Sequence, residues 1–289
     1  MSAEEVVAAW RERGKPLSVR NANTRIWREG SGEPVVCLHG VPASGFVYRK
    51  VLPALAARGL QGVTFDFPGL GFADRPETFD YSWSGLSGWT VDALDAAQID
   101  GFHLIVHDIG GPIGFDVIRR ISGRARSLTV LNSIVRVASF RRPLVMEPFA
   151  HPGIGWLWLQ GLRTPAIIIL MRLVGMHGGI RDDEIRAYGL LLMREDGGRA
   201  FLKIMRSFER TADFEARITA ALQNRSYPAQ VIWGAQDPAL KMKWYAPAMC
   251  KVLGLEDWQP MFGKHFVQED SPNQIAELVA KLVGTAAQP

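Results

Sequence analysis

Short apolar runs recur along this chain and alternate with segments whose apolar positions have helical spacing. The runs that indicate buried strands are bounded by glycine, proline or polar residues, and they lie at 34–38, 62–66, 104–106, 127–131 and 230–233. Helices are predicted between them, for example at 47–58 and 89–98. Buried strands that alternate with helices predict an α/β protein with a parallel sheet and right-handed crossovers.

The two ends of the chain extend this pattern. A helix is predicted at 3–13, and two strand-like pieces follow at 17–21 and 24–28. A last strand at 258–261 and a closing helix at 273–282 complete the expected sheet.

The alternation breaks in a long segment that is helix-like, rich in Met, Leu and Trp, and punctuated by prolines. The simplest interpretation is an α/β core, residues 1–135 and 221–289, interrupted by a helical cap at 136–220. The most apolar stretch of this cap, 165–176, is shorter than the roughly 18 residues of a membrane-spanning helix. We therefore expect a buried or lid helix there.

The strand at 104–106 runs directly into an unusual turn. Asp108 follows it, Gly110 and Gly111 come next, and a helix is predicted from Pro112 onward. Small residues let the backbone fold closely behind such a turn, and the helix N-terminus presents amide donors beside the carboxylate. The geometry is that of a nucleophile elbow with aspartate in place of serine. The alternative is that Asp108 only caps the helix.

Two further strand ends carry ionisable residues. Asp237 follows the strand at 230–233, and His265 precedes the final helix. Taken singly, Asp237 is typical of a turn before Pro238, and His265 is typical of a surface loop. Taken with Asp108, the order Asp, Asp, His matches nucleophile, acid and base at strand ends. The sequence therefore predicts a catalytic triad.

Composition narrows the classes of protein. With 289 residues, 47% of them hydrophobic, the chain can bury a large core. A net charge of +4 without a basic block indicates neither a nucleic-acid nor a membrane partner. Two cysteines, Cys37 and Cys250, and an N-terminus without an apolar signal segment lead us to expect a cytoplasmic protein.

The chain also lacks the spacing that a bound cofactor or metal would require. Residues 69–74 miss the third glycine of a dinucleotide fingerprint, and no His, Cys, Asp or Glu cluster has zinc-ligand spacing. We expect no cofactor and no metal.

Five motifs together resemble the α/β-hydrolase family, and specifically its epoxide hydrolase and haloalkane dehalogenase branch. They are HGVP at 39–42, DFPGLG at 66–71, HDIGG at 107–111, WGAQD at 233–237 and KHF at 264–266. The resemblance implies an α/β-hydrolase fold: a mostly parallel eight-stranded sheet flanked by helices, with a helical cap inserted after strand 6. It also implies an oxyanion hole formed by the backbone amides of Val41 and Ile109.

The chemistry implied by the resemblance is attack by Asp108 on an electrophilic carbon, which gives a covalent alkyl-enzyme ester. His265, oriented by Asp237, would then activate water to hydrolyse that ester. The expected substrate is a small apolar organic molecule, and the expected assembly is a monomer or homodimer.

The leaving group separates the two branches, and this chain departs from both patterns. Dehalogenases of the branch usually have a tryptophan after the nucleophile, where this chain has Ile109, and some have an asparagine where it has Val41. The cap tryptophans Trp156 and Trp158 are alternative halide donors, although a helix-spaced aromatic pair is more often packing.

Epoxide hydrolases of the branch protonate the oxirane oxygen from the cap, usually with two tyrosines. The predicted cap has one, Tyr188, with His151 and His177 as candidates for the second donor. On this basis we expect an epoxide hydrolase that forms vicinal diols. A haloalkane dehalogenase is the first alternative, and an ester or lactone hydrolase or a non-catalytic ligand-binding member is the second.

Overall fold

One eight-stranded sheet forms the centre of the molecule. The computed structural model describes residues 1–161 and 165–286, and its strands are β1 (Lys15–Leu17), β2 (Thr24–Glu29), β3 (Pro34–Leu38), β4 (Gln61–Phe65), β5 (Phe102–Asp108), β6 (Ala125–Ser133), β7 (Ala229–Gly234) and β8 (Gln259–Met261). Their order is β1-β2-β4-β3-β5-β6-β7-β8, with β1, β2 and β4 paired antiparallel and the remaining pairs parallel. The mostly parallel sheet expected from the sequence is confirmed.

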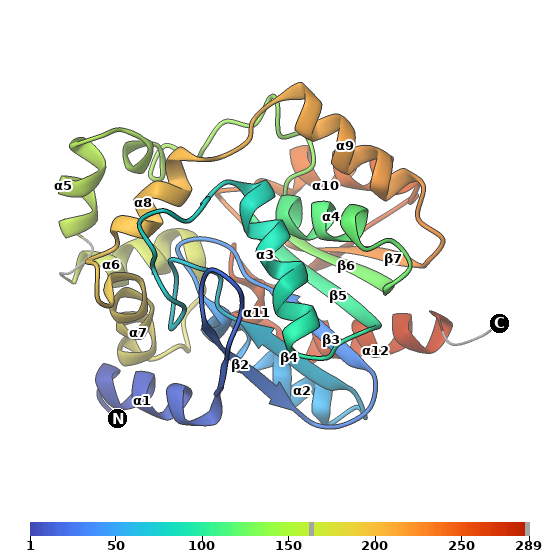
Figure 1. The fold of residues 1–289 in the computed structure, drawn as a ribbon, viewed down its shortest axis with the longest axis horizontal. Helices are drawn as coiled ribbons and strands as arrows, with labels where there is room; N and C mark the ends of the chain where they lie inside the picture. Colours follow the sequence, from blue (N-terminus) through green and yellow to red (C-terminus); the bar gives the residue numbers. More distant parts are fainter. Residues whose placement is uncertain (162–164, 287–289) are drawn as a thin grey trace.

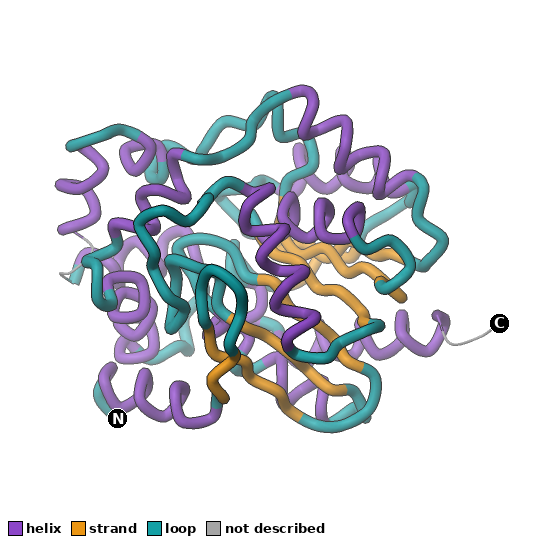
Figure 2. The backbone as a smooth tube through the Cα atoms, viewed as in Figure 1, coloured by secondary structure: helices purple, strands orange, loops and turns teal. Residues whose placement is uncertain are grey.

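The inner strands are apolar because helices cover both faces of the sheet (Figures 1 and 2). The helices α3 (Trp83–Ala96), α4 (Gly110–Arg120), α9 (Ala212–Gln223) and α10 (Met242–Leu253) pack in series along one face. The helices α2 (Val51–Ala56) and α12 (Pro272–Ala286) pack together on the other, and the short helices η1 (Gly45–Tyr48) and α11 (Val267–Asp270) lie in connecting loops.

One strand differs from its prediction. The piece expected at 17–21 is instead β1, Lys15–Leu17, because the chain turns before β2. Asn21 lies in that turn with a left-handed backbone, φ 70°, a conformation that asparagine tolerates better than most residues and that does not continue a strand.

The segment between β6 and β7 supplies the cap. It contains η2 (Glu147–Ala150), α5 (Ile154–Gly161), α6 (Ala166–Leu170), a π-helical turn η3 (Met171–Gly175), α7 (Asp182–Met193) and α8 (Arg199–Arg206). In Figure 1 these elements lie to one side of the sheet, and the N-terminal helix α1 (Ala3–Arg13) packs against α7.

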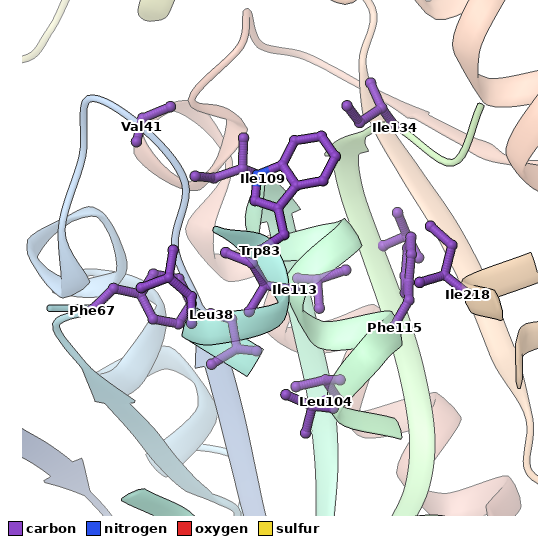
Figure 3. Close-up of a cluster of buried hydrophobic side chains, with 14 of the residues drawn as sticks. Leu38, Val41, Phe67, Trp83, Leu104, Ile109, Ile113, Phe115, Ile134 and Ile218 are labelled. Carbon is purple, nitrogen blue, oxygen red and sulfur yellow. The ribbon is translucent and has the colours of Figure 1, made fainter. Parts of the chain in front are cut away.

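The last helix of the expected cap segment lies with the core. Although α9 falls largely within 136–220, it packs against α4 and α10 beside the sheet. Figure 3 shows Phe115 of α4 beside Ile218 of α9, in a cluster that also holds Leu104 of β5. In the sequence, the apolar face of α9 is compatible with a helix of the cap or of the core. Only its packing in the structure assigns it to the core.

No single helix among the described residues is long and apolar enough to cross a membrane. Only the pair Ile154–Gly161 and Ala166–Gly175 meets the length and composition requirement jointly, and that pair is bent by 93°.

Candidate active site

Asp108 lies at the carboxyl end of β5, in the sharp turn that leads into α4. Its φ is 53°, a left-handed backbone that is costly for a residue with a Cβ. Two glycines make room for the turn: a Cβ at Gly40 would lie 2.3 Å from the Asp108 Cβ, and one at Gly111 would lie 1.8 Å from Ser133 Oγ. The Ser133 hydroxyl also donates to the Asp108 carbonyl at 2.7 Å. The chain thus has the nucleophile-elbow geometry that its sequence predicts.

The two carboxylate oxygens of Asp108 have different neighbours. Oδ1 accepts a hydrogen bond from the Val41 amide at 2.9 Å, while Oδ2 lies 3.4 Å from His265 Nε2. Burial alone would raise the pKa of Asp108, but His265, with support from His107 and the Val41 amide, lowers it below its ordinary value. Ile109, the other expected oxyanion-hole residue, directly follows Asp108 at the start of α4.

Asp237 and His265 meet as the sequence predicts. His265 Nδ1 lies 2.9 Å from Asp237 Oδ2, and the other carboxylate oxygen accepts the amides of Ala239 and Leu240 at 2.7 and 2.9 Å. Asn132, at the end of β6, donates a further hydrogen bond of 2.7 Å to Asp237 Oδ2. The Asp237 carboxylate is buried and held from three sides, which fixes the orientation of the His265 imidazole.

His265 is strongly influenced by its two carboxylate neighbours. Burial disfavours the imidazolium, but Asp237 and Asp108 outweigh it and raise the pKa of His265 to about 10. The neighbouring His107 has the opposite balance: burial and the charge of His265 lower its pKa to about 3. Neutral His107 places Nε2 2.8 Å from the His265 carbonyl oxygen, so its ring can anchor the backbone at His265.

Asp108 and His265 open into one apolar chamber, which we call the central cavity. Apart from these two residues and Arg142, the described residues that line it are Val, Ile, Leu, Met, Phe, Pro, Ala and Gly. The cavity has a volume of about 70 Å³, and one water needs roughly 10–15 Å³ on the same measure. The chamber therefore suits a small apolar molecule.

The expected hydroxyl and imidazole donors do not line the central cavity. Tyr188 is buried in α7, where its phenol meets Glu269 and Arg49. The ring of His177 stacks on Phe262 at 4.5 Å, and the His151 side chain is 57% exposed, 3.7 Å from Glu147. The expectation that the cap tyrosine faces the substrate is therefore corrected. The spacing of residues along a helix does not show which side chain will bind a charged group of the core instead of lining the cavity.

The expected indole donors are also elsewhere. Trp158 is 46% exposed and donates its Nε1 to the Val145 carbonyl at 3.1 Å. Trp156 packs under the Arg199 guanidinium, 5.3 Å from its ring centroid. Neither indole lines the central cavity, so the pair belongs to cap packing.

Sequence reasoning missed two polar residues of the site. Asn132 could have been found, because it ends the strand next to β5, where parallel strands gather their polar residues. Arg142 gives no such signal, because it lies in a loop beside another arginine, Arg141. Among the described residues, no group of three His, Cys, Asp or Glu side chains is arranged to hold a metal ion.

Comparison with known proteins agrees with this geometry. A family model described as alpha/beta hydrolase fold matches residues 33–163. Haloalkane dehalogenase 1 of Mycobacterium tuberculosis (strain ATCC 25618 / H37Rv) is 27% identical over 256 residues, which cover 84% of this chain and 81% of that protein. The uncharacterized hydrolase YugF of Bacillus subtilis (strain 168) is 24% identical, over 87% of this chain and 90% of that protein.

A solved structure shows the same fold. Haloalkane dehalogenase DbeA from Bradyrhizobium elkani USDA94 is 20% identical and has a TM-score of 0.77, with 94% of this chain and 99% of that chain covered.

The chain therefore has the α/β-hydrolase fold. It is similar to haloalkane dehalogenases over most of its length, and Asp108 lies in the elbow turn at the end of β5. The resemblance expected from the five motifs is confirmed. Epoxide hydrolysis, the activity that the cap tyrosine favours, is not the one after which these relatives are named.

Proposed function

We propose that this hydrolase removes halide from small apolar haloalkanes through a covalent ester on Asp108. The observation that carries the proposal is the lining of the central cavity, which has a carboxylate–imidazole pair and no tyrosine among its described residues. Opening an epoxide leaves an alkoxide, which needs a proton. A halide leaves as a stable anion and needs only hydrogen-bond donors, so this lining favours halide over oxirane.

In the first step, Asp108 Oδ2 attacks the sp³ carbon from the side opposite the halogen. The new C–O bond forms as the C–X bond breaks, and the halide leaves with the bonding electron pair. Oδ1, already held by the Val41 amide, becomes the carbonyl oxygen of the ester.

In the second step, His265 acts as the base. Ester formation removes the negative charge of Asp108, one of the two charges that raise the pKa of His265, so alkylation itself shifts the imidazole toward its neutral form. Neutral His265 takes a proton from water, and the oxygen of that water attacks the ester carbonyl carbon. The Val41 amide, with that of Ile109, stabilises the resulting oxyanion, typically by a few kcal/mol per donor. When the oxyanion collapses, the alkyl oxygen leaves as the alcohol with the proton held by His265. The Asp108 carboxylic acid that remains gives its proton back to His265, which restores the carboxylate.

The test is to trap the ester. His265→Gln keeps the nucleophile and removes the base, so it should accumulate an adduct when it is incubated with a mixture of bromoalkanes and small epoxides. Intact mass should show the alkyl group without bromine, and the adduct should disappear in the Asp108→Ala/His265→Gln double variant. The wild-type protein should release bromide from the same bromoalkanes, and this release measures turnover.

Each of the other possible outcomes would indicate a different function. An adduct with the whole mass of an epoxide would restore the epoxide hydrolase interpretation. Ester cleavage that survives Asp108→Ala would indicate an ester or lactone hydrolase. A melting-temperature shift by these compounds, without adduct or product, would indicate a binding protein.

A further inference from the structure

Arg142 is the one arginine or lysine among the described residues that line the central cavity. It lies in the loop between β6 and η2, and only 4% of its side chain is exposed, whereas the preceding Arg141 is exposed. A guanidinium buried among apolar residues loses much of its hydration, and this desolvation lowers the pKa of Arg142 from its ordinary value. Such a buried cation needs compensation.

The compensation that the protein supplies is incomplete. Nη2 donates to the Met205 carbonyl at 2.6 Å, and the guanidinium lies 4.7 Å from the centroid of the Phe208 ring. The carboxylate nearest to it, Glu147, is half-exposed at 3.7 Å, a distance too long for a hydrogen bond. Nε is buried and finds no acceptor among the described residues.

Position separates this unpaired donor from similar ones. Other arginines also bury an Nε without an acceptor in the described part of the chain, namely Arg25, Arg75, Arg217 and Arg225. None of them lines the central cavity, whereas Arg142 lines it together with Asp108 and His265.

The proposed reaction creates the matching ligand. A halide expelled into an apolar chamber is a desolvated anion, and its stability there depends on donors that replace water. The usual indole donor is absent after the nucleophile, where Ile109 stands, and neither cap tryptophan lines the cavity. A guanidinium suits this task because it remains charged and does not protonate the leaving group.

We propose that Arg142 forms the leaving-group subsite of the central cavity and binds the departing halide through its guanidinium. This inference rests on the proposed dehalogenation. It makes Arg142 a binding residue for the anion, in place of the indoles.

Anomalous scattering provides a test that needs neither turnover nor a variant. Crystals of the wild-type protein in sodium bromide should show a bromide peak in the central cavity within hydrogen-bond distance of the Arg142 guanidinium. Bromide found only on exposed arginines such as Arg141 would overturn the inference, whatever the enzyme's activity.

Leaving-group dependence provides the kinetic test. In the His265→Gln background, Arg142→Met should slow ester formation about 100-fold for chloroalkanes, in line with the loss of one charge-stabilising donor. The loss should be smaller for iodoalkanes, because iodide leaves more easily. Arg141→Met, a matched change one residue away, should leave both rates unchanged. A loss equal for all halides would indicate a structural role and overturn the inference.

Two controls separate the remaining possibilities. If Arg142→Met proves poorly folded by circular dichroism, Arg142→Lys serves as the second variant. It keeps the positive charge and should therefore restore part of the chloroalkane rate. If bromoalkanoates alkylate Asp108 much faster than bromoalkanes do, and Arg142→Met abolishes this preference without any leaving-group dependence, Arg142 binds a substrate carboxylate and the halide site is overturned. If bromide occupies the cavity but no alkyl ester ever forms, dehalogenation fails while the anion site stands.

Discussion

The two carboxylate oxygens of Asp108 are held by different neighbours. Oδ1 is already held by the Val41 amide, and the left-handed backbone at Asp108 keeps Oδ2 on the His265 side. Residue types alone predicted which side chains meet here, because each ends a strand of one parallel sheet. The sequence places Asn132 at a neighbouring strand end, but only the structure shows that it binds Asp237, since an asparagine there has many other uses.

At this scale the raised pKa of His265 makes a prediction about stability. The folded pKa, about 10, lies above the ordinary value of 6.5, so folding favours the protonated imidazole. Its contribution to the free energy of unfolding should be complete below pH 6.5 and should decline as the pH rises through 10. Urea titrations from pH 6 to 10 should therefore show wild type losing more stability than His265→Gln. Parallel curves for the two proteins would contradict this assignment.

At the scale of elements, a buried charged cluster joins the cap to the core. Arg49, which follows η1, pairs with Glu269 of α11 and, at 2.7 Å, with Glu184 of α7, while Tyr188 of α7 also meets Glu269. Because α11 begins two residues after His265, this cluster connects the cap to the loop that carries His265. Tyr188 is therefore a structural residue of the junction between α7 and α11.

Tyr188→Phe tests that assignment. Loss of the hydrogen bond to a buried carboxylate should lower the free energy of unfolding by about 2 kcal/mol, while kcat for bromide release stays close to wild type. Urea unfolding and halide-release assays measure the two effects. Tyr227→Phe is the matched control, because the Tyr227 hydroxyl has no partner among the described residues, and its stability should not fall. A large fall in kcat for folded Tyr188→Phe would instead indicate that the phenol takes part in the reaction.

Across the whole molecule, aromatic rings link the N-terminal helix to the central cavity. Trp10 of α1 stacks on Trp27 of β2 at 4.5 Å and meets Phe46 at 5.9 Å. Phe46 meets Tyr188 at 5.1 Å, and Tyr188 meets Phe266, a cavity residue, at 5.8 Å. The first helix of the chain thus supports a cap helix that lies far from it in sequence (Figure 1).

Trp10→Ala should therefore affect the cap as well as the N-terminus. Truncating a buried tryptophan costs roughly 3–5 kcal/mol, so the melting temperature should fall, and amides of α7 should exchange faster with deuterium. Trp244→Ala, at a tryptophan that is 61% exposed, is the control and should change neither. Unchanged α7 exchange in Trp10→Ala would show that the cap is held independently of α1.

The sequence by itself determined the sheet, the elbow and the three residues that meet there. Buried strands, glycine-rich turns and residues at strand ends are local patterns, and a parallel sheet brings such ends to one edge. Only the tertiary structure decided what faces the substrate. In the folded protein Tyr188 contacts Glu269, and α9 packs beside the sheet. The cap tryptophans lie outside the cavity, and Arg142 lines it. The physical reason is that a cap helix has several packable faces, and the one that turns inward depends on partners distant in sequence.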